Sequence, residues 1–227
     1  MAVAASSFIH NTIAQQRQLS IMPLGDSITE LGCWRAYLWT QLIDAGIKNI
    51  QYVGSMTDKP EECGGPNYDK HHEGHAGHQA IDIANRLDYL ATWLKPFTPD
   101  IVLIHLGTVD IVFNKPQADT LAALEKIVDI FRTKNPNVAF IVAKIIPIPA
   151  SAAKVTAYNN ALPTWANKKN STASPITLVD QYAGFNPPKE LQSDNLHPND
   201  AGDRKMTTVW YPAVLSAIEI RQNRTVA

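Results

Sequence analysis

Short runs of β-branched and other apolar residues alternate along the chain with longer segments whose apolar residues recur at helical spacing. This alternation is typical of a parallel sheet whose strands are joined by crossover helices. The run at 101–106 is apolar except for His105, as expected for a central strand covered on both faces. The sequence therefore predicts an α/β fold, a three-layer doubly wound (flavodoxin-like) sheet of about five parallel strands flanked by helices.

The periodicity also places the individual elements. Strands are predicted at 19–24, 50–53, 101–106, 138–146 and 176–179. Helices are predicted at 33–45, 83–94, 121–131, 151–169 and after Pro198. Pro163 should kink or split the fourth helix, and Asn199 or Asp200 should cap the last. The chain shows no repeat, low-complexity tract or linker, so we expect one domain over 19–227 and an N-terminal extension over 1–18.

Composition excludes several classes of protein. Apolar residues make up 45% of the 227 residues, enough for a substantial core. The net charge of -1 argues against a nucleic-acid binder, which usually carries a basic stripe. No apolar run approaches the roughly 20 residues that span a bilayer. We expect a soluble monomer whose partners are neither nucleic acid nor membrane.

Three groups of polar residues, at 25–27, 107–110 and 194–198, are expected at the carboxyl ends of the strands. Ligands of such folds bind at the carboxyl ends of the strands. The hydroxyl of Ser27 is a weak nucleophile that needs a base within hydrogen-bond reach. An imidazole can serve if a carboxylate holds its other ring nitrogen, and Asp194 lies three residues before His197. One loop could therefore present an oriented base to Ser27.

Each of these pieces also has a purely structural interpretation. Ser27 and Glu30 have the spacing of a helix capping box. Residues 194–200 fit a turn and an N-cap with an incidental histidine. Taken singly, these interpretations are the stronger ones; the joint occurrence of both groups in an α/β pattern favours chemistry.

The stretch Ile21–Glu30, IMPLGDSITE, resembles the first block of the SGNH (GDSL-type) hydrolases. With the following Cys33-Trp34-Arg35 it is most similar to carbohydrate esterase family three, the acetylxylan esterases. Residues 73–77 resemble the second block of that branch, and residues 194–198 match the final Asp-Xaa-Xaa-His-Pro block. The blocks occur in the family's order, so the resemblance implies an SGNH hydrolase domain over 19–227.

The resemblance also implies a function and its residues. The protein would be a serine hydrolase that cleaves small acyl esters, above all acetyl esters on carbohydrate, through an acyl-enzyme. Ser27 would be the nucleophile, His197 the general base and then acid, and Asp194 its orienting partner. The backbone N–H groups of Ser27 and Gly77 would point at the oxyanion, and Asp26 would be a turn residue. No cofactor is needed, and the expected partner is a small-molecule or carbohydrate ester.

The third block departs from the family. It normally reads Gly-Xaa-Asn-Asp, and its asparagine supplies another oxyanion donor, but here Val109 stands in that place. Losing one such donor typically costs about 100- to 1000-fold in turnover. His78, Asn114 and Asn195 are the candidates for a substitute.

Val109 keeps two further hypotheses open. One is an intracellular biosynthetic enzyme on the same scaffold, performing acyl transfer, elimination or cyclisation of a specialised metabolite. The other is a catalytically inactive module that binds a glycan in the old cleft.

The substrate pocket is expected to include Asp26, Trp34, Arg35, His78 and Val109. Sugars often stack on rings such as that of Trp34, and Arg35 could bind a substrate carboxylate or carbonyl. The alternatives are a core position for Trp34 and a structural ion pair for Arg35.

The histidine-rich loop at 71–78 raises the question of a metal, because imidazoles with Glu73 could hold zinc. The helical His-Glu-Xaa-Xaa-His arrangement is absent, however, so we expect no metal. His75 and His78 are expected to form a pocket wall or to fix the loop. His105 is expected to be an interior histidine with satisfied hydrogen bonds.

The compartment stays open. Cys33 and Cys63 would form a disulfide in a secreted protein and would more often be free thiols in the cytosol. The N-terminal stretch lacks a basic segment followed by a continuous apolar one. We expect a cytoplasmic protein if Met1 is the native start, and by family resemblance a secreted one if a signal peptide has been removed.

Overall fold

A parallel sheet forms the centre of the protein. The computed structural model describes residues 17–57, 63 and 67–224. In this part of the chain the strand order is β2-β1-β4-β5-β6, and the short β3 pairs with β1. The strands are β1 (Leu19–Gly25), β2 (Ile50–Tyr52), β3 (Glu73–Gly74), β4 (Ile101–His105), β5 (Ala139–Lys144) and β6 (Ile176–Asp180). The predicted α/β fold and its five strands are confirmed; β3 was not predicted, because two residues show no periodicity.

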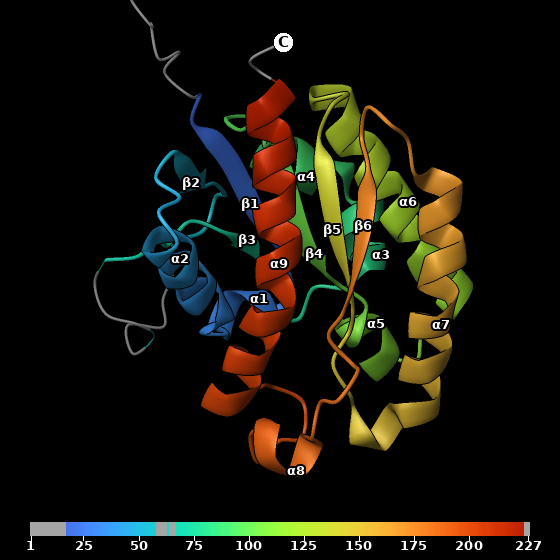
Figure 1. Cartoon of the computed structure of the whole chain (residues 1–227). Helices are drawn as coiled ribbons and strands as arrows, with labels where there is room; N and C mark the ends of the chain where they lie inside the picture. Colours follow the sequence, from blue (N-terminus) through green and yellow to red (C-terminus); the bar gives the residue numbers. More distant parts are fainter. Residues whose placement is uncertain (1–16, 58–62, 64–66, 225–227) are drawn as a thin grey trace, which may run out of the picture.

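Helices cover both faces of this sheet (Figure 1). On one face lie α2 (Trp34–Asp44) and α9 (Asp200–Arg224), which pack on each other and on the sheet. On the other face lie α3 (Ala80–Asn85), α6 (Gln117–Lys134) and α7 (Ala152–Lys169). The shorter helices are α1 (Ser27–Leu31), α4 (Leu87–Trp93), α5 (Thr108–Val112), η1 (Pro149–Ser151) and α8 (Pro187–Glu190). The three-layer arrangement is the one that the sequence predicts.

Three details of the helices test the local predictions. The helix expected over 83–94 is broken into α3 and α4, because Arg86 takes a non-helical conformation (φ -94°, ψ 73°). Pro163 lies inside α7, which runs unbroken from Ala152 to Lys169, so of the expected kink or split the split does not occur. Burial of Leu162 beside it helps to offset the lost backbone hydrogen bond. Asn199 caps α9 as predicted, since its Oδ1 accepts the Gly202 N–H at 3.1 Å.

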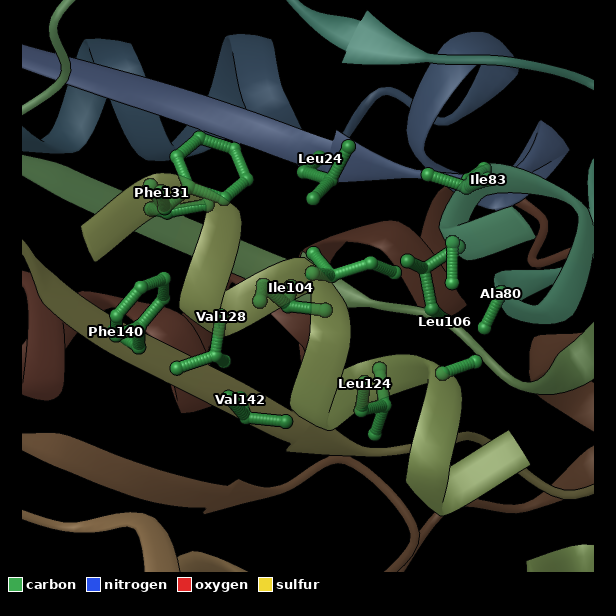
Figure 2. Close-up of a cluster of buried hydrophobic side chains, with 14 of the residues drawn as sticks. Leu24, Ala80, Ile83, Ile104, Leu106, Leu124, Val128, Phe131, Phe140 and Val142 are labelled. Carbon is green, nitrogen blue, oxygen red and sulfur yellow. The ribbon is translucent and has the colours of Figure 1, made fainter. Parts of the chain in front are cut away.

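The core follows the alternation of side chains along the strands. In β4, Val102 and Ile104 face the layer of α3, α6 and α7, whereas Ile101 and Leu103 face α2 and α9. Figure 2 shows the first of these two clusters, in which residues of β1, β4 and β5 meet α3 and α6. Because both faces are covered, the central strand β4 is apolar at every position except His105.

The carboxyl ends of three strands are aligned at Gly25. This residue is in register with His105 of β4 and with Gly74 of β3. A Cβ on Gly25 would come within 2.8 Å of the His105 carbonyl oxygen and would collide with the side chain of Thr29. Only glycine fits there, so the segments that follow these strands start side by side.

Residues 1–16 of the expected extension lie outside the described residues, and Arg17 forms an ion pair with Asp100 at 2.7 Å. Cys33 and Cys63 form a disulfide. Among the helices in the described ranges, none combines the length and the apolar character that crossing a membrane requires.

The packing of α6 on the sheet gives a first prediction. Phe131 is 1% exposed, and its ring meets Phe140 of β5 edge to face with centroids 6.0 Å apart. Phe131→Ala should lower the free energy of unfolding by about 3–5 kcal/mol, through lost burial and the cavity left behind. Urea denaturation measures this change. Ile220→Ala, at a half-exposed position on α9, should change it by less than about 0.5 kcal/mol; equal losses in both variants would contradict the packing described.

Candidate active site

Ser27 is the first residue of α1, directly after the end of β1. The helix is capped by Asp26, whose Oδ1 accepts the Ile28 N–H at 3.0 Å. The capping-box interpretation of Ser27 is therefore wrong, because the cap lies one residue earlier. The first N–H groups of a helix have no partner within the helix, so the N–H of Ser27 is available to a ligand.

The hydroxyl of Ser27 meets a histidine from the far end of the chain. The Nε2 of His197 lies 2.8 Å from Ser27 Oγ, although the two residues are 170 positions apart. The Nδ1 of His197 lies 2.6 Å from Asp194 Oδ2. The other oxygen of Asp194 accepts the N–H groups of Leu196 and His197, each at 3.0 Å. Backbone N–H groups of the loop thus hold the carboxylate of Asp194, and this carboxylate in turn orients the imidazole of His197.

The same contacts set the charge of Asp194. Partial burial raises the pKa of this carboxyl, but its hydrogen bonds from the His197 ring and from two backbone N–H groups outweigh that effect. Its pKa therefore lies below the ordinary value. At neutral pH Asp194 is ionised and can stabilise a positive charge on His197.

A tight turn that contains Gly77 follows β3, whose Gly74 is in register with Gly25 at the end of β1. The turn is anchored at its start by the His75 N–H, which donates to the Gly25 carbonyl at 2.9 Å. It is anchored again by Glu30, whose carboxylate accepts the Ala76 N–H. Gly77 has φ of 76°, which only glycine adopts readily. Within the described ranges its N–H has no hydrogen-bond partner.

Buried groups hold the histidine-rich loop in place. Glu73 is 0% exposed, and its carboxylate accepts the Ser55 N–H at 2.8 Å and lies 2.6 Å from Nε2 of His75. The ring of His75 stacks on Trp93, with centroids 3.9 Å apart. His78 is partly exposed near the same tryptophan. These contacts fix the loop, which is one of the roles expected of His75, and the described residues contain no cluster of metal-ligating side chains.

Val109 lies in α5, where the family has its asparagine. Its side chain is 8% exposed and carries no donor. The neighbouring Asp110 accepts the N–H groups of Ala80 and Ile81, at 2.8 and 3.2 Å. The third block therefore still supports the start of α3, although its donor is gone.

The three candidate substitutes for that donor have other contacts. Nδ1 of His78 lies 3.2 Å from the Ala76 carbonyl, and Asn114 accepts a hydrogen bond from Lys154. The amide of Asn195 turns back to the Ser193 carbonyl at 3.5 Å. None of these contacts joins one of the three candidates to Ser27, so they do not support a substitute for the missing asparagine among His78, Asn114 and Asn195.

Two of the residues expected in the substrate pocket, Trp34 and Arg35, are buried. Trp34 is 0% exposed, stacks on Trp210 and donates to the Ile28 carbonyl at 3.0 Å. Arg35 is 1% exposed and donates to three backbone carbonyls, those of Thr29, Glu30 and Lys70. These two form the base of α1 and cannot touch a substrate, which corrects the prediction.

Asp26 is also wholly buried, and burial raises its pKa to about 7. It acts as a helix cap, in agreement with the expected turn role and not with a place in the pocket. His105 is interior, as predicted, but neither ring nitrogen has a hydrogen-bond partner within the described ranges. Burial lowers its pKa to about 4, so the ring is neutral.

Sequence patterns did not reveal the residues that hold the site together. Glu30 was interpreted as half of a capping box and instead binds the turn of Gly77. Glu73 and Asp110 are buried carboxylates that accept backbone N–H groups from other segments. In the sequence, Glu73 stands directly before the glycine-containing segment 74–77, and Asp110 is the last residue of the third block at 107–110.

Comparisons with known proteins agree with this geometry. A model of the GDSL-like lipase/acylhydrolase family matches residues 24–205. The chain belongs to this family. This match confirms the resemblance to the GDSL-type (SGNH) esterases that the sequence blocks indicate. A comparison with curated proteins finds no match.

Solved structures place this GDSL-type esterase near one branch of the family. A crystal structure of an acetyl esterase mutant with acetate ion is 36% identical, with a TM-score of 0.84 over 88% of this chain and 98% of that one. A carbohydrate esterase family 3 protein from Talaromyces cellulolyticus gives the same values. The family 3 carbohydrate esterase of Clostridium thermocellum is 28% identical, with a TM-score of 0.72 over the same shares.

A buried carboxyl beneath the site gives a prediction about pH. Asp203 of α9 accepts the Cys33 N–H at 2.9 Å, and burial raises its pKa to about 7 from 3.8. Between these values the folded protein keeps a proton on Asp203 that the unfolded chain has lost, so the contribution of this carboxyl to stability falls as pH rises. The buried His105 contributes with the opposite sign between about pH 4 and 6.5. Asp203→Asn cannot ionise and should reduce this fall.

Urea denaturation at steps from pH 4 to pH 7 measures the effect. Asp26 behaves in the same way as Asp203, so the fall should shrink and not vanish. Asp44→Asn, at an exposed position in α2, should leave the pH dependence unchanged. An unchanged slope in Asp203→Asn would show that this carboxyl does not carry the extra proton.

Proposed function

We propose that the protein is a serine esterase that removes small acyl groups, above all acetyl, from carbohydrate or other small esters through a Ser27-His197-Asp194 triad. The observation that carries the proposal is the continuous line of contacts from Asp194 through His197 to Ser27. The acetyl esterase and family 3 carbohydrate esterase at 36% identity support the acyl group and the substrate class.

The reaction follows from the positions of the donors and acceptors. Ser27 Oγ attacks the ester carbonyl carbon while its proton passes to Nε2 of His197, and Asp194 stabilises the imidazolium. The negative charge on the carbonyl oxygen is received by the N–H groups of Ser27 and Gly77. His197 then gives its proton to the leaving alcohol as the C–O bond breaks, which leaves an acyl-serine. Water, deprotonated by His197, attacks this ester and releases the carboxylic acid and free Ser27.

The oxyanion site of this mechanism is built from backbone alone. Backbone donors keep their direction because Asp26 caps α1 and Glu30 anchors the turn of Gly77. Val109 removes a side-chain donor but leaves these two in place. Hydrolysis should therefore proceed at a reduced rate. The similarity to an acetyl esterase and to a family 3 carbohydrate esterase favours an esterase over the biosynthetic enzyme. The complete line of contacts from Asp194 to Ser27 argues against the inactive glycan binder.

The nucleophile is tested by Ser27→Ala with p-nitrophenyl acetate. Turnover should fall by at least about 10⁴-fold, because attack, proton transfer and the acyl-enzyme are all lost. Ser216→Ala, on the exposed side of α9, is the matched control and should retain full activity. Unchanged hydrolysis by Ser27→Ala would exclude the proposed mechanism.

The weakened oxyanion site is tested by Val109→Asn. If the wild type is a working esterase, the added donor should raise kcat from an already measurable value by up to about 100-fold, with little change in KM. Val109→Leu adds no donor and should not raise kcat. A wild type with near-zero turnover that becomes an esterase only in Val109→Asn would favour the biosynthetic enzyme instead.

A further inference from the structure

A groove lies beside the catalytic loop, where the segments that follow β5 and β6 meet α8. Its volume is about 550 Å³, within the range of about 300–1,000 Å³ that small-ligand sites occupy. The lining residues come from three segments: Pro147, Pro149 and Ala152; Tyr182, Ala183, Gly184, Phe185, Pro187 and Pro188; and Asn195. None of these lining residues is a member of the Ser27, His197 and Asp194 group.

The catalytic loop itself connects the groove to the reacting atoms. Asn195, which lines the groove, lies between Asp194 and His197. Its left-handed conformation (φ 55°) and its N–H bond to the Gln192 carbonyl at 3.0 Å shape this loop. The loop is closed by the Gln192 N–H, which donates to the His197 carbonyl at 2.8 Å. A molecule in the groove would therefore lie along the same loop that carries the catalytic base.

The proposed mechanism indicates which part of a bound ester, the acyl group or the alcohol, would lie in the groove. The carbonyl oxygen must face Gly77, whose turn follows β3 at the β1 side of the sheet. The leaving oxygen must face His197, which gives it a proton. The groove follows β5 and β6, on the other side of β4 from Ser27, and shares its loop with His197. It thus continues the alcohol side of the ester and not the acyl side.

The lining has the chemistry of a site for a neutral ring. No charged side chain lines the groove, and its walls are four prolines with the rings of Tyr182 and Phe185. Prolines have almost no side-chain freedom to lose, so the groove is preformed. The amide of Asn195 and the hydroxyl of Tyr182 supply the few polar contacts. A neutral sugar has this same combination of apolar C–H faces and hydroxyl edges.

Tyr182 is held in place from below. Its N–H donates to Asp180 Oδ1 at 3.1 Å, as does that of Ala183 at 2.9 Å. Asp180 forms an ion pair with Lys144 at 2.7 Å, across β5 and β6. The ring packs in part against the core cluster. A partly exposed aromatic ring with a fixed backbone is a suitable platform for a sugar face.

We propose that this groove binds a neutral sugar unit on the alcohol side of the ester, next to the sugar that carries the acyl group. This inference rests on the proposed esterase function and goes beyond it by assigning a site that selects the alcohol. It predicts that esters of a disaccharide gain from the groove, whereas esters of a very small alcohol do not.

The test fills the groove and compares two substrates. Ala152→Trp places a large side chain in it from an exposed position, and Tyr182→Ala removes the platform. For xylobiose that carries a single acetyl group on one sugar and free hydroxyls on the other, each variant should lower kcat/KM by about 10- to 100-fold, the range for a small change in apolar contact within a binding pocket. For methyl acetate, kcat/KM should stay within about two-fold of wild type, because methanol does not reach the groove. Ala153→Trp, the neighbouring exposed position outside the lining, should match wild type for both substrates.

Several outcomes would overturn the inference. Equal effects on both substrates, or no effect on either, would show that the groove does not select the alcohol. A changed preference along a series of p-nitrophenyl esters from acetate to octanoate would assign the groove to the acyl chain. These outcomes leave the Ser27-dependent reaction intact. If wild-type hydrolysis does not depend on Ser27, the proposed function fails and the groove assignment fails with it.

Discussion

The hydrogen bond between His197 and Ser27 is the contact on which the rest of the structure depends. It joins two segments that are 170 positions apart, so both must be held on one scaffold to within a few tenths of an ångström. Beneath the bond, Asp203 of α9 binds the backbone at the start of α2, and Trp34 stacks on Trp210 with ring centroids 5.4 Å apart. The layer of α2 and α9 thus supports both Ser27, the proposed nucleophile, and His197, its proposed general base.

Buried carboxyl groups do similar work on the other side of Ser27. Asp26, Glu73 and Asp110 are all 0% exposed, and each accepts backbone N–H groups at a segment that shapes the site. Burial raises the pKa of Asp26 and of Asp110, which is the energetic cost of placing them there. Rigid backbone donors are obtained at the expense of stability, as is common at catalytic sites.

The sequence predicted the features that depend on residues a few positions apart. It did not predict the features that depend on contacts between distant segments. The strands, the Asp194–His197 pair and the Asn199 cap follow from spacing within a few residues. Trp34 was placed in the pocket because one sequence cannot show which face of α2 turns inward. Glu30 was misinterpreted because its partner lies 46 positions away. The groove could not be foreseen at all, since its lining comes from three separate segments.

The disulfide between Cys33 and Cys63 has a consequence for the environment in which the molecule keeps its shape. It fastens the residue before α2 to the long segment between β2 and β3, closing a loop of 30 positions. A link of this span stabilises a fold by about 3–4 kcal/mol. Thiol-rich surroundings reduce such bonds. The stability of the segment between α1, which begins at Ser27, and α2 therefore depends partly on the redox state of the medium.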